Sequence, residues 1–298
     1  MGSYPKVVAV VGTNASGKSA LGIELAKRYG GEVISADSRQ VFKGLDLGSG
    51  KVTVEEMQGV VHHLIDVREP NEFFSMADFQ KMSYAAIEDI RARGRRPMIV
   101  GGTGLYVDSV LDGYVLSDKE PDLAYRAELE KLTTPELYDM LMGLMPDAQV
   151  DRYNRNRVMR MIERIHDGDS AVPTKEKRYE SLRLGVSWPR DVLGQRIDER
   201  LERRLQEGMI EEVQGLMDRG ATTEFLLGLG LEYRFITQYL LGEMDREEML
   251  SKLAIAIKQF AKRQMTWFRR NPDIVWLDMA GDYMSQACEV VDKFLKVE

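Results

Sequence analysis

The stretch that decides the fold is Val7-Val8-Ala9-Val10-Val11-Gly12-Thr13-Asn14-Ala15-Ser16-Gly17-Lys18-Ser19. Its first five residues are apolar, as in a buried strand, and the rest has the spacing G-x-x-x-x-G-K-[ST] of a phosphate-binding loop. The amphipathic segment that follows, up to Tyr29, predicts a helix whose positive N-terminal end faces the loop. This order of strand, loop and helix indicates that the protein binds a polyphosphate.

The residue types of this loop suit phosphate chemistry. Its glycines let backbone N–H groups close around phosphate oxygens, Lys18 adds a mobile positive charge, and Ser19 can offer its hydroxyl to Mg²⁺. We expect Mg²⁺ as the cofactor and Ser19 as its protein ligand. The residues predicted to bind the phosphate groups are Gly12, Thr13, Asn14, Ala15, Ser16, Gly17, Lys18 and Ser19.

Composition and charge exclude several classes of protein. The formal net charge of −7 argues against nonspecific binding of nucleic acid. No apolar stretch is long enough to span a membrane and no leader peptide is visible, so we expect a cytoplasmic protein. The only cysteine, Cys288, argues against redox catalysis. Two basic segments, residues 152–164 and 258–270, indicate a specific anionic partner, with solvated helix faces as the alternative.

Short apolar runs alternate with helical patterns and predict a parallel α/β core. Between these strands, Ser75 and Asp78 have the spacing of a capping box and predict a helix from Ser75 to the stop at Arg93-Gly94. The predicted strands are Val7–Val11, Glu32–Ala36, Leu64–Val67, Met98–Val100, Leu182–Ser187 and Ile274–Leu277.

The pattern changes to helices alone after Gly113. We therefore predict an α/β fold, a P-loop NTPase-like parallel sheet core with a helical insertion domain. The predicted division is 1–113 for the first part of the core, 114–180 for a helical insertion, and 181–298 for the mostly helical remainder of the core. The helices predicted in the insertion are Asp122–Leu132, Pro135–Met145 and Arg155–His166.

Polar residues follow two of the predicted strands. Because the carboxyl ends of parallel strands line the ligand crevice, Asp37 is expected to face Lys18, with a turn or helix cap as the alternative. The stretch Gly101–Tyr106 lacks the acidic residue with which many P-loop ATPases hold Mg²⁺, which weakens an ATPase interpretation.

Two other motifs do not indicate binding sites. Gly48-Ser49-Gly50-Lys51 lacks the full spacing of a second phosphate loop. The adjacent His62-His63 would point to opposite faces of a strand and cannot chelate one metal ion.

The order and spacing of these motifs resemble the tRNA dimethylallyltransferases, also called tRNA isopentenyltransferases, over nearly the whole chain. Two positions depart from the family's pattern, where the usual Asn-Asp is Tyr153-Asn154 and the usual Gly-Tyr-[Lys/Arg] is Glu232-Tyr233-Arg234. Both departures lie in regions that touch tRNA in the family, so they bear on RNA preference more than on reaction type. The resemblance rests on Gly12–Ser19, Asp37–Gly44, His62–Asp66, Gly101–Tyr106 and Ala261–Arg269.

The resemblance implies transfer of a dimethylallyl group from dimethylallyl diphosphate to N6 of the adenine 3′-adjacent to the anticodon in tRNA, with release of diphosphate. The implied catalytic residues are Asp37 as the general base, Thr103 between the reactants, and Lys18 on the diphosphate. The implied partner is the anticodon stem-loop, and a monomer is expected. The residues implied to contact tRNA are Asp37, Ser38, Arg39, Gln40, Thr103, Arg126, Asn156, Arg157, Arg160 and Arg234.

Several alternatives stay open. Lys262, Arg263 and Trp267 belong to a helix near the active site that either binds substrate or supports the core. A P-loop small-molecule kinase, a nucleotide-switched RNA-binding protein, and an isopentenyltransferase that acts on free adenine nucleotides would share the phosphate loop. The basic insertion favours tRNA, because a free nucleotide would have no use for it.

Overall fold

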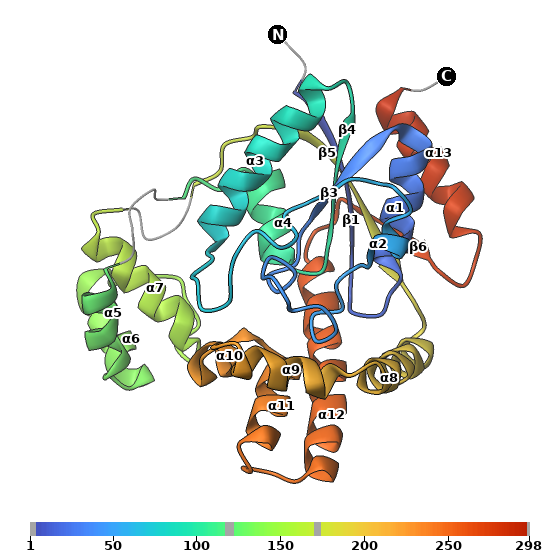
Figure 1. Ribbon diagram of the computed structural model, residues 1–298. Helices are drawn as coiled ribbons and strands as arrows, with labels where there is room; N and C mark the ends of the chain where they lie inside the picture. The colour runs from blue at the N-terminus through green and yellow to red at the C-terminus, as the bar shows by residue number, and fades with distance from the viewer. Residues whose placement is uncertain (1–3, 117–121, 170–173, 297–298) are drawn as a thin grey trace. The chain divides into compact units, whose positions relative to one another are not determined.

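The computed structural model describes residues 4–116, 122–169 and 174–296 (Figure 1). The chain divides into two compact units. The larger unit consists of Met1–Asp112 and Arg178–Glu298, and the smaller consists of Gly113–Lys177. In the described part of the chain, every helix is too short or too polar to cross a lipid bilayer.

A parallel sheet of order β3-β2-β4-β1-β5-β6 forms the centre of the larger unit. β1 lies between β4 and β5, and helices pack against both of its faces, which explains its unbroken apolar run. The predicted α/β fold with a parallel sheet is confirmed. The described strands are β1 (Lys6–Gly12), β2 (Gly31–Ser35), β3 (His62–His63), β4 (Arg96–Gly101), β5 (Glu180–Ser187) and β6 (Ile274–Asp278).

Helices cover both faces of this sheet (Figure 1). On one face, α1 (Lys18–Tyr29) and α13 (Tyr283–Leu295) pack against alternate residues of β1, among them Val8 and Val10. On the other face, α3 (Met76–Ala92) and α4 (Gly104–Leu111) pack against the remaining residues of β1, among them Val7. The capping box of Ser75 and Asp78 begins α3 as predicted.

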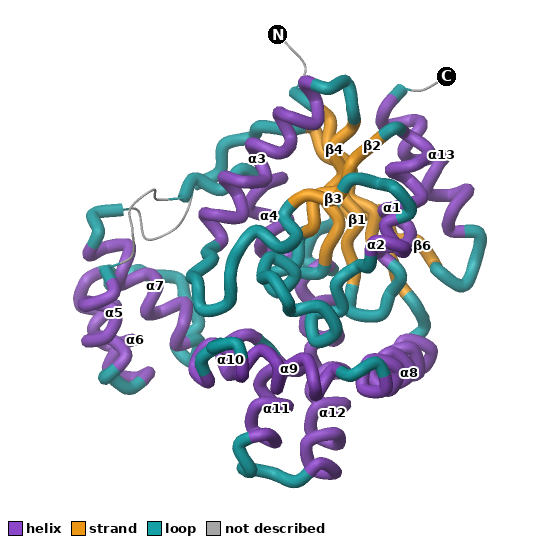
Figure 2. The backbone as a smooth tube through the Cα atoms, viewed as in Figure 1, coloured by secondary structure: helices purple, strands orange, loops and turns teal. Residues whose placement is uncertain are grey.

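A group of helices forms a third core with the loop that follows β2, and Figure 2 shows this group gathered at one end of the sheet. These helices are α8 (Arg190–Gln206), α9 (Met209–Asp218), α10 (Thr223–Leu229), α11 (Leu231–Leu240) and α12 (Arg246–Phe268). A short helix, α2 (Val54–Met57), precedes β3.

The strand predicted at Leu64–Val67 is wrong. The structure has the two-residue strand β3 just before it, at His62–His63. Leu64 and Asp66 have φ angles of 62° and 55°, in the left-handed region, so the chain turns where the apolar pattern predicts an extended strand.

The smaller unit is helical. Its helices are α5 (Leu123–Glu130), α6 (Thr134–Leu144) and α7 (Arg155–His166), which confirms the three helices predicted there. They enclose a separate core that includes Leu129, Leu137 and Val158. The role of this unit in binding tRNA stays a prediction.

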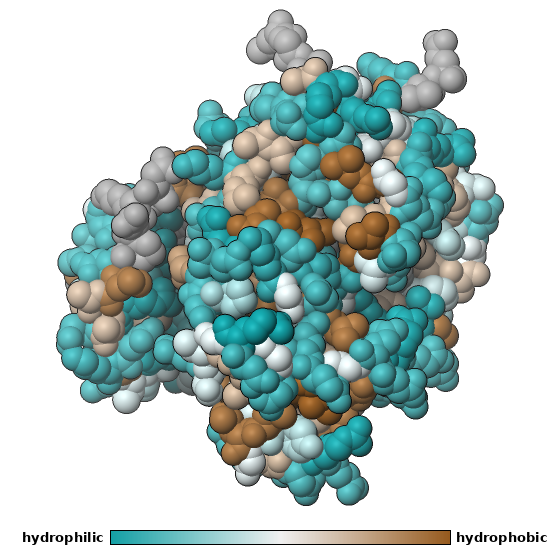
Figure 3. Space-filling model, viewed as in Figure 1, coloured by the Kyte–Doolittle hydropathy of each residue, from teal (hydrophilic) through white to brown (hydrophobic). Residues whose placement is uncertain are grey.

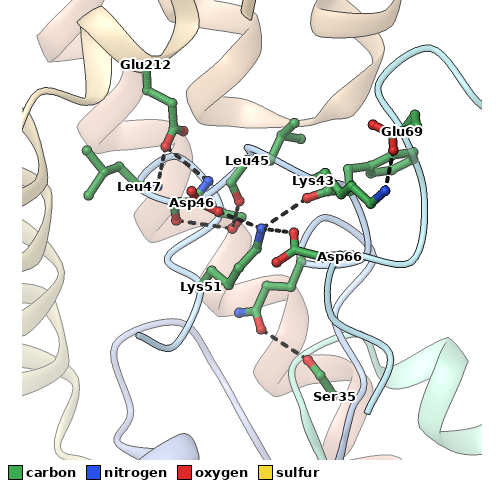
Figure 4. Close-up of polar contacts among 12 residues, drawn as sticks. Ser35, Lys43, Leu45, Asp46, Leu47, Lys51, Asp66, Glu69 and Glu212 are labelled. Atoms are coloured by element: carbon green, nitrogen blue, oxygen red, sulfur yellow. Dashed lines mark hydrogen bonds and ion pairs between the residues drawn. The ribbon is translucent and has the colours of Figure 1, made fainter. Parts of the chain in front are cut away.

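The loop that resembles a second phosphate loop has a structural role (Figure 4). Lys51 is almost fully buried, and its ammonium group donates to the Phe42 carbonyl and forms ion pairs with Asp46 and Asp66. The carboxylate of Glu212, in the first turn of α9, accepts hydrogen bonds from the backbone N–H groups of residues 46, 47 and 48. The positive charge of Lys51 therefore stabilises the loop and is not directed at a phosphate group.

Glu212→Gln should destabilise the protein, because an amide cannot accept from three N–H groups and the Tyr233 hydroxyl as the carboxylate does. We expect a loss of about 1–3 kcal/mol in the free energy of unfolding, measured by denaturant titration. Glu211→Gln removes an exposed carboxylate from the same helical turn and serves as the control. Equal stability of the two variants would contradict this role of Glu212.

Candidate active site

The phosphate loop connects β1 to α1. The residue before α1, Gly17, has a φ angle of +89°, and no side chain caps the helix, so the first backbone N–H groups of α1 have no partner within it. A Cβ atom on Gly12 would lie 2.5 Å from Val186 Cγ2, so only glycine fits there. The Lys18 ammonium group donates to the Thr13 carbonyl at 3.2 Å. The loop therefore presents free amides and a lysine to an anion.

Gln264 of α12 ties the phosphate loop to the end of β4. The Asn14 N–H donates to Gln264 Oε1 at 3.0 Å, and Gln264 Nε2 donates to the Gly102 carbonyl at 2.9 Å. The Gln264 side chain is buried. This residue was absent from the predicted site, although it lies within the basic segment that was singled out.

Two further side chains donate hydrogen bonds to backbone carbonyls of the phosphate loop. Arg196 Nε donates to the Ala15 carbonyl and Trp188 Nε1 to the Ser16 carbonyl, both at 2.9 Å. The Arg196 guanidinium also lies 4.6 Å from the centre of the Trp188 ring. The sequence prediction missed these contacts, because they join residues more than 170 positions apart.

Asp37 lines two pockets of the larger unit. We call the first the lysine pocket, with a volume of about 330 Å³. The second, the arginine cleft, has a volume of about 510 Å³. The lysine pocket is lined by Lys18, Ser19, Val33, Ser35, Asp37, Gln40, Val52, His62, Val100 and Gly101. The arginine cleft is lined by Asn14, Ala15, Asp37, Arg39, Gly48, Ser49, Ile197, Arg200, Arg204, Leu231, Glu232, Ile257 and Phe260.

The Asp37 side chain is held by its own loop. Asp37 Oδ1 accepts from the Arg39 N–H at 3.0 Å, so the turn-capping alternative is also present. Its other oxygen, Oδ2, has no hydrogen-bond partner among the described residues. Next to it, Thr103 Oγ1 accepts from the Ser38 N–H at 3.2 Å. The structure thus brings together Asp37, Thr103 and Lys18, as the sequence predicts.

Burial and neighbouring charges shift the pKa values of Lys18 and Tyr106. The pKa of Lys18 is lowered to about 8, chiefly by burial and next by the positive charge of Arg200, while the charge of Asp37 acts in the opposite direction. Burial, followed by the charge of Asp37, raises the pKa of Tyr106 to about 12. The charge of Asp37 therefore acts on both residues.

The lysine pocket offers oxygen atoms suited to Mg²⁺. Ser19 and Asp37 both line it, and the Ser19 hydroxyl has no hydrogen-bond partner among the described residues. The described residues contain no group of three or more His, Cys, Asp or Glu that could hold a metal ion, so bound Mg²⁺ would rely on diphosphate and water oxygens. The two neighbouring histidines have separate partners, Val60 for His62 and Glu32 for His63.

Arginines of α8 form one wall of the arginine cleft. Arg200 donates to the Gly50 carbonyl at 3.0 Å, and Arg204 donates to Glu232 Oε1 at the same distance. With Arg196 they are spaced four residues apart and share one helix face. That spacing is a signal from which the sequence analysis could have found them.

The remaining predicted RNA contacts do not line either pocket. In the smaller unit, Arg126 and Arg160 form ion pairs with the buried carboxylate of Glu163 at 3.3 and 3.1 Å. Asn156 and Arg157 of the same unit are exposed. In the larger unit, Arg234 is exposed on α11, with its guanidinium 4.8 Å from the centre of the Phe235 ring.

The three residues singled out near the end of α12, Lys262, Arg263 and Trp267, have different surroundings. Trp267 Nε1 donates to Asp108 at 2.8 Å, and its ring packs on Gly104, where a Cβ atom would lie 2.3 Å away. Trp267 therefore supports the core. Lys262 and Arg263 are exposed, and the Arg263 guanidinium lies 5.5 Å from the centre of the Phe260 ring in the arginine cleft.

The parallel sheet, the phosphate loop and the facing carboxylate define a P-loop α/β protein. Residues 40–271 match the family model of the IPP transferases. The chain is 45% identical over 295 residues to tRNA dimethylallyltransferase 2 of Shewanella sediminis, with 96% of this chain and 97% of that protein covered. It is 40% identical over 290 residues to the tRNA dimethylallyltransferase of Bacillus pumilus, with 92% and 89% covered.

Solved structures agree with these relatives. The full-length tRNA isopentenylpyrophosphate transferase of Bacillus halodurans has a TM-score of 0.75 and 39% identity, covering 98% of this chain and 96% of its own. A eukaryotic dimethylallyltransferase acting on tRNA has a TM-score of 0.84 and 26% identity, covering 98% and 80%. The chain belongs to the tRNA dimethylallyltransferase family, which confirms the resemblance found in the sequence.

Lys18 should make diphosphate binding pH-dependent. Its pKa of about 8 means that the free site is charged below that pH and neutral above it. The affinity of the wild type for pyrophosphate, relative to Lys18→Gln, should therefore fall by about tenfold per pH unit above this pKa. Calorimetric titration from pH 7 to about 10 at fixed Mg²⁺ measures this ratio, in which the ionisation of pyrophosphate cancels. A constant ratio would contradict the assignment.

Proposed function

We propose that this protein transfers the dimethylallyl group of dimethylallyl diphosphate to N6 of the adenine 3′-adjacent to the anticodon in tRNA and releases diphosphate. The observation that carries this proposal is the position of Asp37, which lines both pockets. On one side it shares the lysine pocket with Lys18 and Ser19, and on the other it faces the arginine cleft. One carboxylate is thus placed between a site for diphosphate and a site for the acceptor.

The chemistry requires a base and a stabilised leaving group. The lone pair of an adenine amino group is delocalised into the ring, so removal of its proton during bond formation aids attack. We assign that proton to the open Oδ2 of Asp37. As the N6–carbon bond forms, the carbon–oxygen bond breaks and its electron pair leaves with diphosphate. Lys18 and the loop N–H groups stabilise the growing negative charge.

Mg²⁺ and Thr103 complete the donor site. When bound at Ser19, Mg²⁺ supplies further positive charge for the diphosphate. The Thr103 hydroxyl accepts from Ser38, so its own hydrogen is free to donate to a reactant oxygen or nitrogen. We place Thr103 between donor and acceptor on this ground.

The arginine cleft suits the unpaired bases of an RNA loop, both the target and a neighbour. It combines the ring of Phe260 with Arg39, whose guanidinium lies 5.5 Å from the ring centre. Stacking on aromatic and guanidinium planes is how proteins hold unpaired RNA bases. The activity named for the relatives favours this transfer over a kinase or a nucleotide switch, and the exposed basic residues of the smaller unit favour tRNA over free nucleotides. We also propose that the protein acts in the cytoplasm.

Asp37→Asn should lower single-turnover transfer to an anticodon stem-loop by about 10²–10⁴-fold, because the base is lost. The asparagine oxygen can still accept from the Arg39 N–H, so the loop should keep its conformation. Affinities for pyrophosphate and RNA should stay within about threefold of the wild type, since neither depends on proton removal. If RNA binding collapses while transfer in the bound state survives, Asp37 only positions the substrate.

Arg157 and Arg160 should behave differently. Arg160 is paired with Glu163, whereas the Arg157 side chain has no partner among the described residues. Arg157→Ala should weaken tRNA binding without loss of thermal stability, and the slope of log affinity against log salt should become shallower by about 0.7–0.9 if it meets one phosphate. Arg160→Ala should lower the melting temperature. Unchanged affinity and salt slope in Arg157→Ala would contradict the proposed RNA contact.

A further inference from the structure

The arginine cleft contains a second carboxylate, Glu232, in the first turn of α11. It occupies the position where the family's usual pattern has glycine. The residue is 8% exposed, and its Oε1 accepts from Arg204 at 3.0 Å. Its Oε2 accepts no hydrogen bond from any described residue. This oxygen belongs to a largely buried residue that lines the cleft, and it is open to a hydrogen-bond donor.

The Arg204–Glu232 pair fixes which oxygen stays open. Arg204 also donates to the backbone carbonyls of residues 47 and 48, and it is itself 8% exposed. With its guanidinium anchored in this way, Arg204 holds Oε1 in place. Because the open oxygen belongs to a cleft-lining side chain and has a free acceptor position, it can accept from a donor supplied by a ligand.

The rest of the cleft indicates the kind of ligand. Phe260 offers an aromatic face, with the guanidinium groups of Arg39 and Arg263 each 5.5 Å from the ring centre. Ile197 and Ile257 add apolar walls. Such a surface stacks a planar base, and a carboxylate oxygen beside it accepts from an exocyclic amino group and repels a carbonyl oxygen.

We propose that Glu232 is a specificity-determining residue that accepts a hydrogen bond from the exocyclic amino group of a nucleobase next to the target adenine. This inference rests on the proposed function, which assigns the N6 group of the target adenine to Asp37. The base bound by Glu232 is therefore a neighbour of the target in the single-stranded loop. The favoured neighbour carries an amino group, as adenine and cytosine do, and uracil and hypoxanthine are disfavoured.

This proposal can be tested with RNAs that differ at one position by bases of nearly the same shape. Anticodon stem-loops are prepared with cytidine or uridine, and with adenosine or inosine, at the 5′ or the 3′ neighbour of the target adenine. For the wild type, kcat/KM should favour the amino-bearing member of each pair by about 10- to 100-fold at one of the two positions, as expected for a charged hydrogen bond. Equal kcat/KM within every pair at both positions would overturn the proposal.

Glu232→Gln should reverse this preference. Its amide oxygen must face the donating group of Arg204, so its NH₂ group takes the place of Oε2 and favours uridine and inosine. Glu243→Gln, which changes a carboxylate outside the cleft, is the control and should keep the wild-type preference. An unreversed preference in Glu232→Gln would contradict the proposal.

Two results keep the inference separate from the proposed function. If the wild type modifies all stem-loops at equal rates, only the role of Glu232 fails. If it modifies neither the stem-loops nor tRNA, the proposed function fails. The wild-type comparison requires no variant, so it can overturn the proposal even if Glu232→Gln does not fold.

Discussion

A path of hydrogen bonds joins the phosphate loop to Asp37, and the active site depends on it. The Asn14 N–H bonds to Gln264, which bonds to the Gly102 carbonyl. The next residue, Thr103, accepts from the N–H of Ser38, the neighbour of Asp37. The proposed diphosphate site and the proposed general base are thereby fixed relative to each other. Such positioning accounts for a large part of an enzyme's rate enhancement, because the reaction is fastest when the reacting groups are aligned to within fractions of an ångström.

The electrostatics of the site follow from burial. The positive charges of Lys18, Arg200 and Arg204 line the two pockets with the negative charges of Asp37 and Glu232, and Arg204 and Glu232 are buried. The lowered pKa of Lys18 shows that its positive charge is held at a cost in the free protein. In the proposed donor site, a bound diphosphate would relieve that cost by pairing with the lysine. Charges that are already oriented before the ligand binds can stabilise the charge that develops during the reaction.

Local signals in the sequence predicted the elements that depend on local physics. The run Val7–Ser19 predicts β1, the loop and α1, because apolar residues, glycines and a helix start are adjacent there. Asp37 was found because the carboxyl ends of parallel strands meet at one edge of the sheet. The strand predicted at Leu64–Val67 was wrong, because nothing in the side-chain pattern encodes the positive φ angles of Leu64 and Asp66.

Contacts between distant segments could not be predicted in this way. Gln264 reaches Asn14 across 250 positions, and Arg204 pairs with Glu232 across 28. By contrast, the pair Arg160–Glu163 has helical i,i+3 spacing, and pairing with acids of the insertion is the alternative to RNA contact that the sequence itself offers for this arginine.

The central claim is that Asp37 stands between donor and acceptor. The most direct measurement is a crystal structure of the protein with an anticodon stem-loop and an unreactive thiol analogue of dimethylallyl diphosphate. The account predicts a carboxylate oxygen of Asp37 at about 2.6–3.2 Å from N6 of the adenine 3′ of the anticodon, with the diphosphate on the loop amides. An N6 group beyond hydrogen-bond reach of Asp37, with a different side chain against it, would contradict the account.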